Sequence, residues 1–471
     1  MDSQNVVFIF SDQHNPSFTG CYGNQLTRTP NLDRLATEGI RFDNAFTPCP
    51  LCVPARAAMF AGKYAFELEL YDNTRGWDGT PGGWSHYLKK QGIPFTTIGK
   101  LDFHPGADHG IAEEIFEKHR TQPWSEVKMP SWAGRHKEKI AADTDGFLPA
   151  KFTIPPESED KGYFAEIAGT APHNGVHPDI TADLSSTAFA VEWLKNHRPR
   201  HEPWVLNINM WKPHSPWHPD KKRWDHYDNH IRYDELHEKY RDERAKHFAI
   251  RNNQLRVGIQ HLTPEQIRRC HIGYHATIEF VDSNVGRILD TLDTHGLSGN
   301  TTVIYAADHG ECVGAHGCFA KNVPYDDAMR VPLIVRRPGG PSKRASQSLV
   351  SLFDIFPTIC SAVGLPLPDA MRGNSLFDSV DQNTAPYVFC ECHEKKSVDM
   401  YAIRTLEHKY VETDDGSRML FDMINDPHEM NDLAKAKAAD TEAGKIMDDM
   451  RGVLHSVCDP ERVTRQYRAK F

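Results

Sequence analysis

The run Val6-Val7-Phe8-Ile9-Phe10, followed by Ser11-Asp12-Gln13, decides the fold class of this chain. Its unbroken series of β-branched and aromatic residues predicts a strand buried in the core. A helical pattern of apolar residues extends from Thr263 to Leu292, and its start, Thr263-Pro264-Glu265, places a proline in the first turn. Further core strands are predicted at 95–98, 204–209 and 302–306. Strands that alternate with helices predict an α/β protein around a large, mainly parallel sheet.

The pattern changes in the C-terminal part of the chain. Short strands are predicted at 387–389, 401–404 and 409–412, and a polar helix at 441–454. Such a series predicts a small antiparallel sheet with a helix. We therefore expect a catalytic α/β domain over residues 1–375 and a C-terminal α+β subdomain over residues 376–471.

Two stretches, about 105–176 and 219–260, are expected to be insertions over the edge of the sheet. Neither is of low complexity, so we expect ordered loops and helices on the substrate side. The chain also carries candidate tryptophans for a cation-binding box or a sugar-stacking surface, namely Trp77, Trp84, Trp124 and Trp132. Core packing is the alternative role for these side chains.

The composition is that of a globular protein of 471 residues with a formal net charge of -10. This charge argues against a nucleic-acid partner, although a local basic pocket can still bind an anion. The segment from Met1 to Phe10 has no basic region and only a short apolar run, and no apolar stretch is long enough to span a membrane. The 10 cysteines show no disulfide framework. These features predict a cytoplasmic protein with reduced thiols and no membrane partner.

The segment Cys52-Val53-Pro54-Ala55-Arg56 predicts the start of a helix. Pro54 suits the first turn, and Gly62 can end the helix. Cys52 is thereby expected at a helix N-terminus, where backbone N–H groups favour negative charge. Other interpretations stay open: a buried cysteine, a reactive cysteine of low pKa, or a redox or zinc pair with Cys49 in C-x-x-C spacing. The sequence has no second C-x-x-C motif to complete a zinc site.

Polar clusters follow four of the predicted core strands. They are Asp12-Gln13, Gly99-Lys100, Lys212-Pro213-His214 and Asp308-His309-Gly310. The carboxyl ends of parallel strands share one edge of a sheet, and open α/β proteins bind ligands at that edge. Any one cluster alone is explained as well by a loop with surface charges. Four of them on one edge, with Cys52 at a helix start, predict a functional site.

Asp12, Asp308 and His309 supply two hard oxygen ligands and an imidazole, which suit a divalent cation with open coordination positions. Gln13 adds a carbonyl oxygen as a further candidate ligand. A histidine next to an aspartate is otherwise a common surface pair. Its place after a strand favours the metal role for His309.

Other polar side chains predict the binding of an anion. Lys100 and Lys321 are candidates for neutralising a dense anion such as sulfate, although a single lysine is more often solvent-exposed. His214 lies between Pro213 and Ser215-Pro216, so its backbone is rigid and its ring is a candidate proton donor to a leaving oxygen. Asn73 either hydrogen-bonds a substrate oxygen or closes a turn.

The motifs also resemble those of a known family in their order along the chain. That family is the type I sulfatases. The segments of this chain that resemble sulfatase motifs, and follow one another in the same order, are Thr29-Pro30-Asn31-Leu32-Asp33, Cys52-x-Pro54-x-Arg56, Gly99-Lys100, Pro213-His214, Asp308-His309-Gly310-Glu311, Lys321, Arg330-Val331-Pro332-Leu333 and Phe421-Asp422-x-x-Asn425-Asp426-Pro427. The resemblance covers nearly the whole chain. It implies the fold of the alkaline-phosphatase superfamily, a formylglycine made from Cys52 by a formylglycine-generating maturase, and one Ca²⁺ or Mn²⁺ ion.

The resemblance implies roles for single residues as well. The formylglycine at position 52 would be the catalytic nucleophile. The metal ligands would be Asp12, residue 52, Asp308 and His309, with Gln13 as an additional candidate. The sulfate pocket would be lined by Arg56, Lys100, His214 and Lys321.

The chain departs from the commonest family pattern at a few positions. Ala55 stands where a serine is usual, a change that the family tolerates. Gln13 and His309 stand where many sulfatases have Asp and Asn, and this combination is similar to the branch of choline sulfatases and phosphonate monoester hydrolases. The family often has Gly-Lys-x-His, whereas this chain has Gly99-Lys100-Leu101-Asp102-Phe103-His104. Either His104 reaches the substrate through a changed turn, or Asp102 replaces the imidazole.

The sequence therefore predicts a metal-dependent sulfatase that hydrolyses the sulfate monoester of a sugar or of a small organic alcohol. The alternative is a phosphonate monoester or phosphodiester hydrolase that uses the same site. A third hypothesis is a sulfatase-like binding protein in which Cys52 stays unmodified, and the complete set of site residues argues against it. Homo-oligomerisation is left open.

Overall fold

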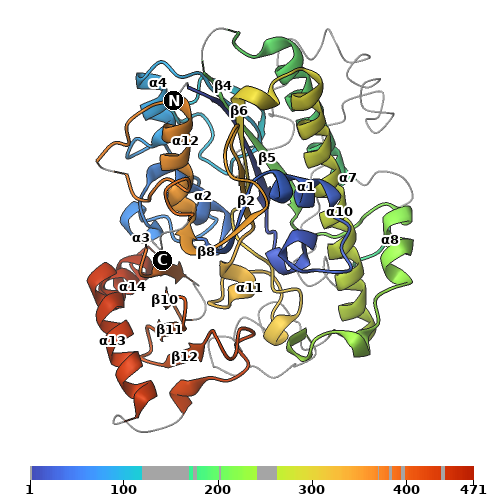
Figure 1. Ribbon diagram of the computed structural model, residues 1–471. Helices are drawn as coiled ribbons and strands as arrows, with labels where there is room; N and C mark the ends of the chain where they lie inside the picture. Colours follow the sequence, from blue (N-terminus) through green and yellow to red (C-terminus); the bar gives the residue numbers. More distant parts are fainter. Residues whose placement is uncertain are drawn as a thin grey trace.

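The computed structural model describes residues 3–118, 169–172, 178–200, 203–240, 262–369, 371–380, 385–393, 398–435 and 441–470. Within them, a large sheet lies between two layers of helices, and a smaller sheet lies at one end of it (Figure 1). The strands of the large sheet are, in spatial order, β4 (Glu113–Lys118), β3 (Phe95–Lys100), β5 (Val205–Pro213), β1 (Asn5–Asp12), β6 (Thr301–Ala307), β7 (Leu333–Arg336), β2 (Ile40–Phe46) and β8 (Arg344–Ser351). β7 runs antiparallel to both neighbours, and the other neighbouring pairs are parallel. The predicted α/β fold with a mostly parallel sheet is confirmed.

Helices cover both faces of the large sheet (Figure 1). One face packs against α2 (Cys52–Ala61), α4 (Trp84–Lys90) and α12 (Ile355–Val363). The other packs against α1 (Pro30–Glu38), α7 (Pro178–Glu192) and α10 (Pro264–Thr294). The predicted long helix is confirmed as α10, and the Thr263 hydroxyl caps it by accepting a hydrogen bond from Gln266 N at 3.2 Å. The shorter helices α3 (Ala65–Leu68), α8 (Lys221–Asp228) and α11 (Asp326–Met329) lie in the connections.

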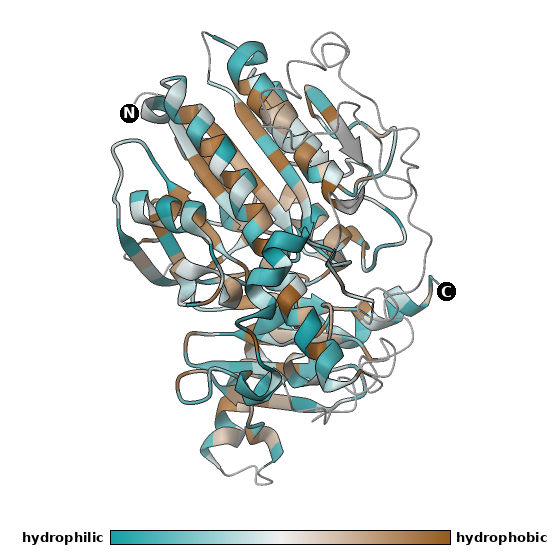
Figure 2. Cartoon of the chain, turned by 90° about the vertical axis from the view of Figure 1, so that its right-hand side faces the viewer, coloured by the Kyte–Doolittle hydropathy of each residue, from teal (hydrophilic) through white to brown (hydrophobic). Residues whose placement is uncertain are grey.

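β1 shows why its apolar run decides the fold. Phe8 and Phe10 belong to the core beneath α2, α4 and α12, whereas Val7 and Ile9 belong to the core beneath α1, α7 and α10. All four side chains are fully buried. Because both faces of the strand are covered, apolar residues are needed at every position rather than at alternate ones. In Figure 2 the hydrophobic colour runs along the strands of the large sheet, and the helices in front of it carry both colours.

The register brings the carboxyl ends of four neighbouring strands, β3, β5, β1 and β6, to the same edge. Phe10 of β1 lies opposite Asn209 of β5 and Ala306 of β6, and Gly99 of β3 also lies opposite Asn209. The chain therefore leaves all four strands at one place. The residues that follow there are the four polar clusters predicted from the sequence.

The smaller sheet has the order β12 (Arg418–Asp422), β11 (His408–Thr413), β10 (Met400–Arg404) and β9 (Val388–Cys392), with antiparallel neighbours. α13 (Glu442–Val457) packs on it, so the predicted C-terminal sheet and helix are confirmed. A last helix, α14 (Pro460–Arg468), was not predicted because its sequence is strongly polar; Asp459 caps it by accepting from Arg462 N at 3.0 Å. The predicted boundary between residues 375 and 376 lies between the two sheets and stays a prediction.

The first predicted insertion falls largely on residues outside those described, as do Trp124 and Trp132, and the second is described as far as residue 240. Within the first insertion, residues 113–118 form β4, the edge strand of the large sheet, so this part is not an insertion over the edge. α8 belongs to the second insertion, and its Trp224 packs with Ile272 of α10. Trp77 and Trp84 are 1% and 0% exposed and lie in the core, which is the packing role given above as the alternative. None of the helices within the described ranges has both the length and the apolarity needed to cross a membrane.

Candidate active site

Cys52 begins α2, as predicted, and only 2% of its surface is exposed. Gly62 follows the helix with a φ of 66°, the left-handed conformation that commonly ends helices. The side chain of Asn73 accepts a hydrogen bond from Val53 N at 3.0 Å, so it satisfies one of the free N–H groups of the first turn. Asn73 therefore fixes the helix start beside residue 52.

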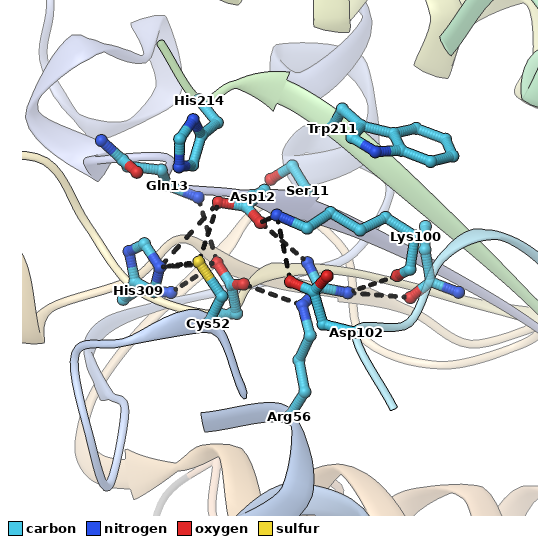
Figure 3. A network of polar contacts seen from close by, with 12 residues as sticks. Ser11, Asp12, Gln13, Cys52, Arg56, Lys100, Asp102, Trp211, His214 and His309 are labelled. Atoms are coloured by element: carbon cyan, nitrogen blue, oxygen red, sulfur yellow. Dashed lines mark hydrogen bonds and ion pairs between the residues drawn. The ribbon is translucent and has the colours of Figure 1, made fainter. Parts of the chain in front are cut away.

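Four buried side chains, those of Asp12, Cys52, Asp308 and His309, form a group suited to a metal ion. Their ligand atoms all lie within 4.8 Å of one another. His309 Nδ1 lies 2.9 Å from the carbonyl oxygen of Gly310 and donates a hydrogen bond to it, which leaves the lone pair of Nε2 for the group. Nε2 is 3.3 Å from Cys52 Sγ and 3.6 Å from Asp308 Oδ1. Two carboxylates, an imidazole and residue 52 thus converge, and the donor set fits a divalent cation (Figure 3).

Arg56 lies behind the two carboxylates rather than in an open anion pocket. It is 1% exposed, and its Nε donates to Asp308 Oδ2 at 2.9 Å while its Nη2 lies 3.5 Å from Asp12 Oδ2. The guanidinium also stands over the ring of Phe10 and donates to the carbonyl oxygen of Lys100 at 2.7 Å. Burial alone would lower the pKa of Arg56, but Asp308 and Asp12 raise it above its usual value. Arg56 therefore orients the proposed metal ligands, and its predicted place in the sulfate pocket stays a prediction.

The two carboxylates have opposite electrostatic environments. Burial would raise the pKa of Asp12, yet Lys100 and Arg56 hold it well below its usual value. Burial, and then the charge of Asp12, raise the pKa of Asp308. Two carboxylates that repel each other in a buried pocket are relieved by a cation between them.

The charges around the Cys52 thiol favour its deprotonated form, the thiolate. Burial and Asp12 act to raise its pKa, but Lys321, Lys100 and His309 together lower the pKa to about 6. The position at the start of α2 favours negative charge in the same direction. The structure therefore supports the interpretation of a reactive residue at position 52 over that of an inert buried thiol.

Lys321 and His214 form the proton-bearing side of the site. Lys321 Nζ lies 2.8 Å from His214 Nε2, and His214 Nδ1 lies 2.6 Å from the carbonyl oxygen of Ser215. The carbonyl requires a donor at Nδ1, so Nε2 accepts from the ammonium of Lys321. Burial and the charge of Lys321 hold the pKa of His214 well below its usual value, which gives a neutral ring.

Gln13 connects this pair to a residue whose role the sequence did not reveal. Its backbone N donates to Asp308 Oδ1 at 3.0 Å, its side-chain oxygen accepts from Lys321, and its side-chain nitrogen donates to Glu311. Glu311 also accepts from Val313 N at 3.0 Å and Ala320 N at 2.6 Å. It thereby holds the loop that carries Lys321. In the sequence, the only signal for Glu311 is its place at the end of the Asp-His-Gly-Glu motif. The role of Gln13 as a metal ligand stays a prediction.

The structure distinguishes between Asp102 and His104. Lys100 Nζ contacts Asp12 and lies 3.2 Å from Asp102 Oδ2, and Asp102 is buried (Figure 3). His104 is exposed, and its Nδ1 lies 3.0 Å from the carbonyl oxygen of Pro105. Asp102 therefore joins the cluster, whereas the predicted substrate-binding residue His104 is not brought into it. The turn after Lys100, which includes Asp102 at a φ of 61°, accounts for the difference.

Comparison with known proteins shows to which family the chain belongs. The model of the sulfatase family matches residues 4–365, which is more than half of the chain. The chain belongs to the sulfatase family. A second model, for the C-terminal part of N-sulphoglucosamine sulphohydrolase, matches residues 314–456. Membership of the family makes the protein a sulfuric ester hydrolase.

Relatives within this family act on different esters. The N-acetylglucosamine-6-O-sulfatase of Bacteroides thetaiotaomicron is 25% identical over 499 residues, covering 91% of this chain and 82% of the relative. The choline-sulfatase of Rhizobium meliloti is 26% identical over 454 residues, covering 92% and 82%. Among solved structures, the phosphonate monoester hydrolase of Agrobacterium radiobacter superposes with a TM-score of 0.72 at 22% identity, covering 96% of this chain and 95% of the other. The last similarity concerns the fold.

Proposed function

We propose that the protein hydrolyses the sulfate monoester of a sugar or a small organic alcohol, with a formylglycine made from Cys52 as its nucleophile. One divalent cation, Ca²⁺ or Mn²⁺, would be held by Asp12, residue 52, Asp308 and His309, with Gln13 as a further candidate. The observation that carries the proposal is the position of Cys52 Sγ among the buried ligand atoms at the start of α2. The named activities of the sugar sulfatase and the choline-sulfatase support the substrate class.

When present, the metal and the hydrated aldehyde at position 52 would supply a polarised hydroxyl that attacks sulfur. The chain's own residues prepare the site for this reaction. Arg56 fixes both ligand carboxylates, and the amines of Lys100 and Lys321 offset the negative charge of the transferred group. The charges of Lys321 and Lys100 lower the pKa of the thiol at position 52.

The departing alcohol needs a proton, and the pair of Lys321 and His214 is placed to supply it. Lys321 holds the proton, since it donates to the neutral ring of His214. Protonation by a positioned group matters most when the leaving alcohol is a weak acid.

Replacing His214 or Lys321 with alanine should therefore slow the hydrolysis of alkyl sulfates far more than the hydrolysis of nitrophenyl sulfate. We expect kcat/KM for an alkyl sulfate to fall roughly 100-fold or more, in the range of general acid catalysis. The kcat/KM for the nitrophenyl ester should fall much less, because nitrophenolate leaves without being protonated. His230→Ala, an exposed change after α8, serves as the control and should affect neither ester. Equal losses on both esters in both variants would contradict the proton role.

The alternative function, hydrolysis of phosphonate monoesters or phosphodiesters, is tested by changing only the transferred group. The amines of Lys100 and Lys321 suit either anion, because a phosphonate monoester and a sulfate monoester both carry one negative charge. We predict the higher kcat/KM for sulfate when the same nitrophenyl ester of each acid is compared. A phosphonate value tenfold above the sulfate value, about 1.4 kcal/mol of transition-state preference, would favour the alternative.

We also propose that a formylglycine-generating maturase modifies Cys52 and that the protein works in the cytoplasm. All ten cysteines are free thiols, which supports a reducing location. Mass analysis of residue 52 after expression with and without the maturase tests the first of these proposals.

A further inference from the structure

Asp102 is a buried carboxylate of the site to which the proposed reaction assigns no step. It is 4% exposed, and its Oδ2 lies 3.2 Å from Lys100 Nζ. We propose that Asp102 is a specificity-determining residue, which lowers the positive charge around the transferred group and so disfavours dianionic phosphate monoesters relative to sulfate monoesters. The inference rests on the proposed function, because it concerns the same anion site.

The charge of Asp102 acts through Lys100. The Lys100 amine lies between the carboxylates of Asp12 and Asp102 (Figure 3). Asp12 belongs to the metal group, whereas Asp102 does not. Asp102 thus adds a second negative charge beside a lysine that would otherwise attract the anion more strongly.

The backbone holds Asp102 in this place. Its neighbours Leu101 and Phe103 are fully buried in the core on the α2 side of the sheet. Two positions after Asp102, His104 N donates a hydrogen bond to the carbonyl oxygen of Trp77 at 2.8 Å, which fixes the backbone on that side. Asp102 itself has a φ of 61°, a left-handed conformation that aspartate and asparagine adopt more readily than most residues. It is therefore a fixed charge rather than a mobile surface group.

A fixed charge discriminates between substrates of the same shape. Sulfate and phosphate monoesters are both tetrahedral, but the phosphate carries close to two negative charges at mildly alkaline pH and the sulfate carries one. A carboxylate near the site repels the second charge, and burial limits the screening of this repulsion by salt. Removal of the carboxylate should favour the dianion over the monoanion, whatever the absolute rates are.

Asp102→Asn removes the charge while keeping the side-chain shape and the tolerance for a positive φ. We expect the ratio of kcat/KM for nitrophenyl phosphate to that for nitrophenyl sulfate to rise at least tenfold, which is about 1.4 kcal/mol. A nitrophenyl phosphonate monoester, with one negative charge, should keep its ratio to sulfate. Asp102→Gly, which suits the same φ, repeats the test if the asparagine variant is unstable. Asp290→Asn, an exposed carboxylate on α10 that pairs with Arg34 at 2.9 Å, should change no ratio.

A binding measurement separates this inference from the proposed chemistry. Calorimetry at mildly alkaline pH with phenylphosphonate, a dianion under these conditions, and benzenesulfonate, a monoanion, requires no turnover by residue 52. Asp102→Asn should raise the affinity for phenylphosphonate relative to benzenesulfonate. Unchanged ratios in both rates and affinities would overturn the role of Asp102. Absence of sulfate ester turnover in the wild-type protein, with the affinity ratio shifted as expected, would count against the proposed function alone.

Discussion

Cys52→Ala is expected to abolish the hydrolysis of sulfate esters while the protein stays folded. The loss should be on the order of 10⁴-fold or more, because no other group at the start of α2 replaces the covalent nucleophile. Alanine is a good helix residue and Cys52 has a small side chain, so the melting temperature should change little. Initial rates with nitrophenyl sulfate and a thermal melt of the same preparation measure both effects.

Cys49→Ala is the matched control for this variant. Cys49 is also a buried free thiol and precedes Cys52 in C-x-x-C spacing, but it is not in the metal group. Its replacement should leave turnover intact, which would exclude a redox pair as the basis of activity. Substantial turnover in Cys52→Ala would contradict the nucleophile assignment.

Asp308→Asn should lose bound metal and most of the activity together. The carboxylate of Asp308 belongs to the metal group and also accepts hydrogen bonds from Gln13 N and His309 N, at 3.0 and 2.9 Å. Asparagine keeps an oxygen at this position but removes the charge that a divalent cation requires. Elemental analysis should therefore show less Ca²⁺ or Mn²⁺ per chain, and added Mn²⁺ should no longer raise the melting temperature. In the wild type, Mn²⁺ should serve at least as well as Ca²⁺, because imidazole tolerates softer ions.

Asp282→Asn provides the comparison for a buried carboxylate outside the site. Asp282 accepts hydrogen bonds from Asn31 N and Leu32 N at the start of α1, at 3.0 and 2.8 Å. Its replacement should lower stability, yet the melting temperature should still rise on addition of Mn²⁺. Full activity of the wild-type protein after exhaustive chelation would refute the metal role.

Much of the fold is predictable because its signals are local. The apolar run of β1 requires burial on both faces, and the proline and glycine around α2 define where that helix begins and ends. Once the parallel sheet is predicted, the polar residues after β1, β3, β5 and β6 must share an edge. This is why Asp12, Lys100 and Asp308 could be placed in one site before any contact was known.

The parts that could not be predicted depend on contacts distant in sequence. The burial of Arg56 follows from packing against Phe10 and from two carboxylates contributed by different strands. The choice between Asp102 and His104 depends on the left-handed backbone conformation of Asp102, which cannot be predicted from a segment without glycine. Glu311 acts by accepting backbone hydrogen bonds from its own loop, and an acidic residue in a loop otherwise suggests a surface charge.

The central claim is that residue 52, converted to formylglycine, performs the reaction. The most direct test is the mass of the peptide containing residue 52, measured on the same preparations whose specific activity is known. Expression with different amounts of maturase should yield different fractions of the aldehyde form. Activity proportional to that fraction, and none in the cysteine form, is the predicted result. Full activity in protein whose residue 52 is entirely cysteine would contradict the claim.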